Sequence, residues 1–110
     1  MAIHLIGKKC VACEGGTPPF TPQQITEYRK EIASSWEVVD GKKLHREFKF
    51  KDFVETMKFV NKVADLAENE GHHPDLHIFY NRLVIELTTH AIKGLSENDF
   101  ILAAKIEILL

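Results

Sequence analysis

Hydrophobic residues recur first with a helical period and then with a period of two, and this change of period repeats along the chain. The first helical stretch carries Ile25, Tyr28 and Ile32 on one face, as expected for an amphipathic helix. It begins at Thr21-Pro22-Gln23-Gln24, which combines an N-cap threonine, a proline at the first helical position and a glutamine that can complete a capping box. We therefore predict a helix over residues 22–34.

A second helix is predicted over residues 53–69, because Asp52 and Glu55 form another capping-box pattern just ahead of an apolar stripe. The stripe comprises Phe53, Met57, Val60, Ala64 and Ala67. We expect this face of the helix to lie on a sheet.

Segments with a period of two lie on either side of this second helix. Residues 36–39 and 44–50 are predicted to be two strands around Asp40-Gly41, and residues 76–80 and 83–89 two more around Asn81-Arg82. Inward-facing side chains are expected at Phe48, Phe50, Leu83, Ile85 and Leu87.

The last predicted helix covers residues 97–109 and follows Ser96-Glu97-Asn98-Asp99. It is apolar on nearly every side, and a helix of that kind has to bury more than one face. We therefore expect its outer side to pack on another subunit, which predicts a homo-oligomer. The whole order, α-β-β-α-β-β-α, predicts an α+β fold in which a four-stranded, mainly antiparallel sheet carries three helices on one face.

Composition limits the classes of function. The 110 residues are 45% hydrophobic and 27% charged, as in one globular domain, and we assign the domain to residues 21–110 and an N-terminal arm to residues 1–20. A formal net charge of −2 offers no basic field for direct nucleic-acid binding. Residues 1–9 lack a signal-peptide pattern, and no segment approaches the roughly 18 apolar residues that span a membrane. We expect a soluble, cytoplasmic protein with no membrane partner.

The arm contains both cysteines, Cys10 and Cys13, in a Cys-x-x-Cys arrangement. This is half of a zinc site, and no second pair follows at zinc-finger spacing. A thioredoxin-like redox pair should open a helix after a strand, whereas Gly-Gly-Thr-Pro-Pro follows here. A metal or redox role stays an alternative, and we favour a mobile arm.

Three of the six histidines gather in one region, at Gly71-His72-His73-Pro74-Asp75 and at Thr88-Thr89-His90. Histidine has an unperturbed pKa of about 6.5, so imidazoles in one cleft can supply an acid and a base near neutral pH. Pro74 holds His73 extended, so the side chains of His72 and His73 should diverge and not chelate one metal ion. The pattern indicates proton transfer, as in a reaction that removes water, and no metal site. We expect structural or surface roles for His4, His45 and His77.

These motifs resemble the pterin-4a-carbinolamine dehydratases, also called 4a-hydroxytetrahydrobiopterin dehydratases, over about residues 20–108. The resemblance rests on Gly71-His72-His73-Pro74, Tyr80-Asn81, Thr89-His90, Gly94-Leu95-Ser96-Glu97-Asn98-Asp99 and Ala103-Ala104-Lys105-Ile106. It implies a lyase without a cofactor that dehydrates 4a-hydroxytetrahydropterin to quinonoid dihydropterin, in tetrahydropterin recycling for aromatic amino-acid hydroxylases. It also implies a homodimer or homotetramer with a functional link to such a hydroxylase.

The resemblance further implies which residues form the site. The catalytic residues are His72, His73 and His90, and the substrate-binding residues are His72, His73, Pro74, Thr89, His90, Ala91 and Ile92. We expect His73 and His90 to be the principal proton-transfer pair, with His72 assisting. Asp99 and Glu68 align near the site, where Asp99 could orient a histidine or simply cap a helix, and Glu68 could be a solvated charge.

Two further functions stay open at this point. Animal relatives resemble dimerisation cofactors of a homeodomain transcription factor, so an interaction protein is one alternative. A role with pterins linked to molybdenum cofactor is the other. Leu76 departs from many relatives, which carry an aromatic residue there, and implies a slightly different pocket wall.

Overall fold

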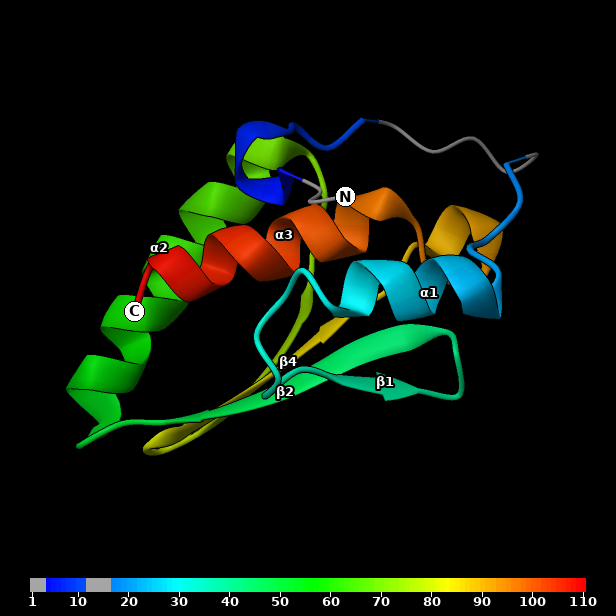
Figure 1. The fold of residues 1–110 in the computed structure, drawn as a ribbon. Helices are drawn as coiled ribbons and strands as arrows, with labels where there is room; N and C mark the ends of the chain where they lie inside the picture. The colour runs from blue at the N-terminus through cyan, green and yellow to red at the C-terminus, as the bar shows by residue number, and fades with distance from the viewer. Residues whose placement is uncertain (1–3, 12–16) are drawn as a thin grey trace.

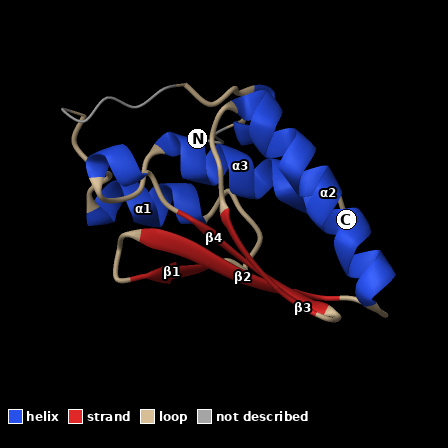
Figure 2. Ribbon diagram, turned by 180° about the vertical axis from the view of Figure 1, so that it is seen from behind, coloured by secondary structure: helices blue, strands red, loops and turns tan. Residues whose placement is uncertain are grey.

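A four-stranded antiparallel sheet carries three helices on one of its faces (Figure 1, Figure 2). The computed structural model describes residues 4–11 and 17–110. The helices are α1 (Pro22–Arg29), α2 (Phe53–Glu70) and α3 (Glu97–Ile108), and the strands are β1 (Glu37–Val39), β2 (Lys43–Lys49), β3 (Asp75–Phe79) and β4 (Arg82–Leu87). Two short 3-10 turns, η1 (Leu5–Gly7) and η2 (His90–Ile92), complete the order. The predicted fold class and element order are confirmed.

The sheet order β1-β2-β4-β3 places β2 and β4 at its centre. In their antiparallel register Phe48 faces Leu83 and Leu44 faces Leu87, and all four side chains are buried. Because alternate residues of a strand point to opposite faces, this register gives the helix-facing side of the sheet an apolar surface. None of the helices in the described part of the chain has the length and apolar character needed to cross a membrane.

Most of the outer side of α3 is covered by the protein's own chain, and of its apolar residues Ile108 is exposed, at 57%. Phe100, Leu102 and Ile106 are fully buried within one molecule, and α3 is contacted by α1, α2 and η1. Figure 1 shows the N-terminal segment in blue running past α2 and over α3, where it buries Leu5 and Cys10. The apolar character of α3 is therefore explained within one molecule, because part of the arm that we expected to be mobile covers it. The homo-oligomer itself stays a prediction.

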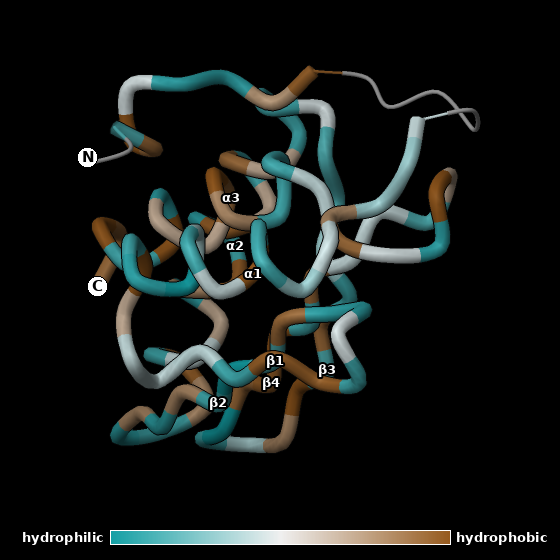
Figure 3. The backbone as a smooth tube through the Cα atoms, turned by 45° about the vertical axis from the view of Figure 1, so that its right-hand side comes forward, coloured by the Kyte–Doolittle hydropathy of each residue, from teal (hydrophilic) through white to brown (hydrophobic). Residues whose placement is uncertain are grey.

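Helix α1 is shorter than predicted and ends at Arg29. Its guanidinium donates hydrogen bonds to the carbonyls of Ala33 and Ser34, which stabilises a turn in place of a further helical turn. The turn lets both Ile32 and the fully buried Trp36 reach the core. Figure 3 shows α1 mostly in teal and white, in keeping with the small number of apolar residues it contributes.

The buried face of α2 is rotated from the predicted one. It comprises Thr56, Phe59, Val60, Val63 and Ala67, whereas Phe53 and Ala64 are exposed. Apolar residues lie on both candidate stripes, so the period alone does not choose between them. Thr56 suits the buried side because its hydroxyl donates to the Asp52 carbonyl at 2.9 Å.

Candidate functional site

The first histidine segment leaves α2 through a left-handed glycine. Gly71 has φ 68°, a conformation that glycine adopts without strain. The backbone N–H groups of Gly71 and His72 both donate to the carbonyl of Ala67. This cap stops the helix abruptly, and His72 and His73 follow it directly into the connection to β3.

The second segment follows β4 and is closed by a short loop. Thr89 and Gly94 form an isolated antiparallel bridge, and η2 lies between them. Gly94 is required here because a Cβ atom at this residue would lie 2.7 Å from the Cβ of Pro19, closer than two carbon atoms pack. The bridge and this close contact fix the loop that carries His90 and Ala91.

The two segments meet at one cavity of about 330 Å³. Its lining residues are Val11, Gly71, His72, His73, Thr88, Thr89, His90, Ala91 and Asn98. The structure thus brings together the three histidines with Thr89 and Ala91. Pro74 and Ile92 do not line the cavity, and Ile92 is buried in the protein at only 7% exposure.

Asp99 lies behind His72 and is completely buried. One carboxylate oxygen lies 2.6 Å from Nε2 of His72. The other accepts hydrogen bonds from the Thr89 hydroxyl at 2.8 Å and the Ser96 backbone N–H at 3.0 Å. Asp99 therefore caps α3 and holds the His72 ring at the same time. It makes the contacts of both roles considered from the sequence, the helix cap and the histidine partner. A carboxylate that fixes one ring nitrogen of a histidine leaves the other nitrogen to face a ligand.

Glu68 is a surface residue beside His73. Its carboxylate lies 3.7 Å from Nε2 of His73, with the two side chains 81% and 63% exposed. An ion pair this long and this exposed contributes little to stability. Glu68 does not line the cavity, and we assign it no fixed position in the site.

Four residues that line the cavity were not among the predicted site residues: Val11, Gly71, Thr88 and Asn98. Gly71 belongs to the histidine motif itself. Thr88 precedes the Thr89-His90 pair and could have been inferred from that neighbourhood. Asn98 carried a signal only as part of a helix-capping motif. Val11 carried none, because its contact with Asn98 joins residues far apart in the sequence.

The structure gives Cys10 a packing role. Its thiol is buried and lies 3.6 Å from the carbonyl of Asn98. Burial and the nearby Glu70 carboxylate raise the pKa of this thiol to about 12, whereas metal binding and thiol exchange need the thiolate. Among the described residues no group of three or more histidine, cysteine or acidic side chains is arranged to hold a metal ion. Cys13 lies outside the described residues.

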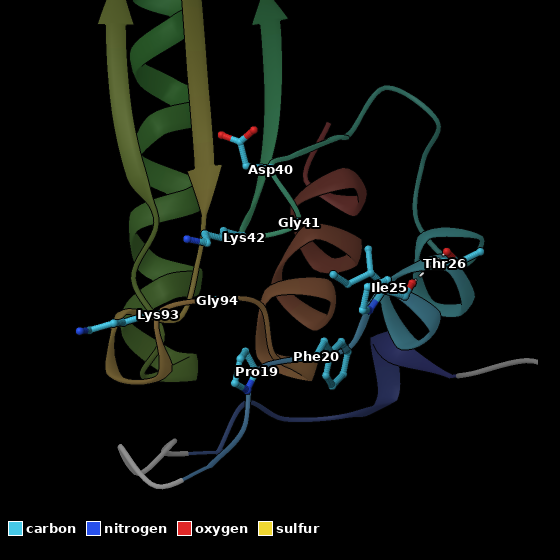
Figure 4. Close-up of a pocket in the computed structure, with 10 residues that line it drawn as sticks. Pro19, Phe20, Ile25, Thr26, Asp40, Gly41, Lys42, Lys93 and Gly94 are labelled. Carbon is cyan, nitrogen blue, oxygen red and sulfur yellow. Dashed lines mark hydrogen bonds between the residues drawn. The ribbon is translucent and has the colours of Figure 1, made fainter.

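A second cavity, of about 440 Å³, lies near the start of α1 (Figure 4). Pro19, Phe20 and Ile25 line it together with the turn between β1 and β2, at Gly41 and Lys42. It is mainly apolar and contains no histidine, so the chemistry that the sequence indicates belongs to the smaller cavity.

Comparison with known proteins agrees with the motifs at this cavity. The family model for pterin 4 alpha carbinolamine dehydratase matches residues 18–109. A relative from Rickettsia bellii is 47% identical over 105 residues, 96% of this chain and 93% of its own. Another from Alkaliphilus metalliredigens is 44% identical over 104 residues, 94% of each chain. Both are named provisionally as pterin-4-alpha-carbinolamine dehydratases.

Two solved structures are also similar. A crystal structure described as a transcriptional coactivator/pterin dehydratase from Brucella melitensis has a TM-score of 0.77 and 34% identity, covering 83% of this chain and 97% of its own. A pterin dehydratase-like protein identified as a RuBisCO assembly factor in the alpha-carboxysome has a TM-score of 0.59 and 26% identity over 68% of this chain and 88% of its own. With nearly the whole chain matched in sequence and most of it in structure, the protein belongs to the pterin 4 alpha carbinolamine dehydratase family.

Proposed function

We propose that this protein is a cytoplasmic lyase that removes water from 4a-hydroxytetrahydropterin and forms quinonoid dihydropterin. The reaction would return tetrahydropterin to the cycle that serves aromatic amino-acid hydroxylases. One observation carries the proposal: three histidines from two separate segments line one cavity, and one of them is bound to a buried carboxylate.

The chemistry needs one proton donor and one proton acceptor. The C4a–O bond breaks as the hydroxyl oxygen takes up a proton and leaves as water. The N5 lone pair forms the C4a=N5 double bond, and the N5 proton is removed. General acid and base groups typically contribute about 10²–10⁴-fold each, and the electrons come from the pterin itself, so the proposed reaction uses no cofactor.

The environments of the histidines support a division of roles. His73 and His90 are exposed at the cavity, where a substrate arriving from solvent can meet them, and we assign them the proton transfers. His72 is held by Asp99 at 2.6 Å, and we assign it an assisting role, with its second ring nitrogen available to the pterin. The substrate-binding residues in this proposal are the three histidines, Thr89 and Ala91.

Our proposal for the quaternary state rests only on the family resemblance. We propose a homodimer or homotetramer, in line with that resemblance. The interaction-protein alternative drew its support in this chain from the apolar last helix, and α3 is buried within a single molecule. We therefore put forward no second function.

The test is the rate of 4a-hydroxytetrahydropterin dehydration from about pH 5 to 9, for the intact protein and for His73→Ala and His90→Ala. We expect acceleration over buffer and a loss of about 10²–10⁴-fold in each variant. His77→Ala is the matched control, because His77 is also an exposed histidine but lies outside the cavity, on the sheet beside Glu86.

Circular dichroism and thermal melting should show that all variants stay folded. Well-folded intact protein that does not accelerate the reaction would contradict the proposal. An equal loss in His77→Ala would contradict the assignment of His73 and His90.

A further inference from the structure

The first residues of the chain contribute a wall to the cavity. Val11 lines it, and this residue is 71% exposed. The preceding residue, Cys10, is buried at 7%. The chain therefore leaves the protein interior between these two residues and presents an aliphatic side chain at the mouth of the site.

Val11 is fixed from the side of α3. Its backbone N–H donates to the side-chain oxygen of Asn98 at 3.0 Å, and its carbonyl accepts from the side-chain nitrogen of the same residue. Asn98 is itself only 4% exposed. A buried amide that binds both backbone groups of one residue holds that residue in a single orientation.

The residue before Val11 is fixed just as firmly. The backbone N–H of Cys10 donates to Glu70 at 2.9 Å, and the same carboxylate accepts from Lys105 at 2.7 Å. The side chains of Glu70 and Lys105 are 10% and 17% exposed, so this ion pair is largely shielded from solvent. Exposed termini are poorly ordered unless they are tied down, and here the buried Asn98 and the largely shielded Glu70 tie down Cys10 and Val11.

The residue types that line the cavity indicate a binding role for Val11. Six of the nine lining residues are histidine, threonine or asparagine, and Val11 and Ala91 supply the aliphatic side chains among the described lining residues. The bicyclic ring system of a pterin carries hydrogen-bonding groups along its edges and has less polar faces. Ligand sites of this kind combine apolar walls for the faces with a few polar groups for the edges.

We propose that Val11 is a substrate-positioning residue that packs against the pterin ring, and that Asn98 holds it in place. The inference rests on the proposed function and extends it by assigning Val11 to the binding site. Because the contact is made equally before and during the reaction, its loss weakens binding and leaves the chemical step unchanged.

The primary test is a titration of the protein, carrying ¹³C-labelled valine methyl groups, with 7,8-dihydrobiopterin in an NMR experiment. The methyl signals of Val11 should shift on binding. Those of Val54 should not, because Val54 is a comparably exposed valine, at 60%, on α2 and outside the cavity. Val11→Ala removes two methyl groups and should raise the dissociation constant by about 4- to 15-fold, and Val54→Ala should leave it unchanged.

Kinetics add a second measurement. KM for the 4a-hydroxytetrahydropterin should rise by the same factor in Val11→Ala while kcat changes by less than about 2-fold. Asn98→Ala should raise KM similarly, and adding Val11→Ala to it should change little more, because both substitutions remove one contact. If Asn98→Ala does not fold, the titration of the exposed Val11 variant still decides.

The outcomes separate the two proposals. An active protein whose Val11 signals stay fixed, or whose Val11→Ala variant binds normally, overturns the inference and leaves the dehydratase intact. If the protein is inactive but its Val11 signals shift, the dehydratase proposal is contradicted and the contact between Val11 and the pterin is supported. An inactive protein that does not bind the dihydropterin overturns both.

Discussion

The hydrogen bonds of Asp99 predict a separable effect on catalysis and on stability. One oxygen of its carboxylate lies 2.6 Å from His72, and the other accepts hydrogen bonds from Thr89 and Ser96. Asp99→Asn keeps the shape but replaces one oxygen by an NH₂ group, which can only donate. If the remaining oxygen keeps the bonds to Thr89 and Ser96, the NH₂ group faces Nε2 of His72 and requires this nitrogen to be an acceptor.

The magnitude follows from the kind of bond that is lost. A hydrogen bond to a charged group contributes about 1.5–3 kcal/mol, and this energy stabilises His72 whenever the ring carries a positive charge. If the proton transfers draw on His72, Asp99→Asn lowers kcat by about 10- to 150-fold. KM should also rise, since the switch of tautomer turns the ligand-facing nitrogen of His72 from an acceptor into a donor.

Single-turnover and steady-state rates, measured beside urea unfolding, test this prediction. Asp52→Asn is the matched control, because Asp52 caps α2 by accepting from the N–H of Glu55 at 2.9 Å and does not line the cavity. Both variants should lose about 0.3–1 kcal/mol of unfolding free energy, because each removes a negative charge from the N-terminus of a helix. Unchanged kcat in a destabilised Asp99→Asn protein would refute the role in orienting His72 and leave Asp99 as a cap alone.

Three further predictions concern the packing around the site. Burial raises the pKa of Glu70, but hydrogen bonds from Lys105 and from the Cys10 N–H outweigh it and hold the pKa below its ordinary 4.5. Its stabilising effect is therefore present above pH 4.5 and is lost as the pH falls through the lower folded value, so Glu70→Gln should cost about 1–3 kcal/mol in urea unfolding at pH 7 and much less near pH 3. Gly94→Ala would bring a methyl group within 2.7 Å of Pro19 and should cost about 1–3 kcal/mol; Gly7→Ala, with no atom within 4 Å, is the control and should change the melting temperature little. The thiol of Cys10, with its pKa raised from 9.0 to about 12, should react with a disulfide reagent about 10³-fold more slowly than in the urea-unfolded chain at pH 8, and peptide mass spectrometry that finds rapid labelling of Cys10 in the folded protein would contradict its burial.

The buried face of each strand could be predicted from the sequence, because a period of two allows only two arrangements of the side chains. A shift of one residue would have turned Leu83, Ile85 and Leu87 from the core to solvent, and all three are fully buried as expected. The helical stripe of α2 was less well determined, since neighbouring turns offered two apolar faces. The error there was one of rotation about the helix axis and did not alter the fold.

The histidine cavity depended on a different kind of information. His72, His73 and His90 could be identified from residue type and family resemblance, and the hairpin topology brings their segments together. The place of Val11 in the cavity wall could not be predicted, because its contact with Asn98 joins residues 87 apart. Motif spacing describes local geometry, so it contains no information about a tertiary contact between residues far apart in the sequence.

The first turn of α3 links the fold to the site. Asn98 and Asp99 are adjacent in sequence, yet one binds Val11 and the other binds His72, which both line the cavity. Small displacements of such groups are costly to a reaction that depends on orientation. Because α3 is enclosed by the sheet, α1, α2 and the N-terminal segment, it has little freedom to move. The apolar surface around the rest of this helix anchors it in the core, and through Asn98 and Asp99 the anchored helix fixes two walls of the candidate site.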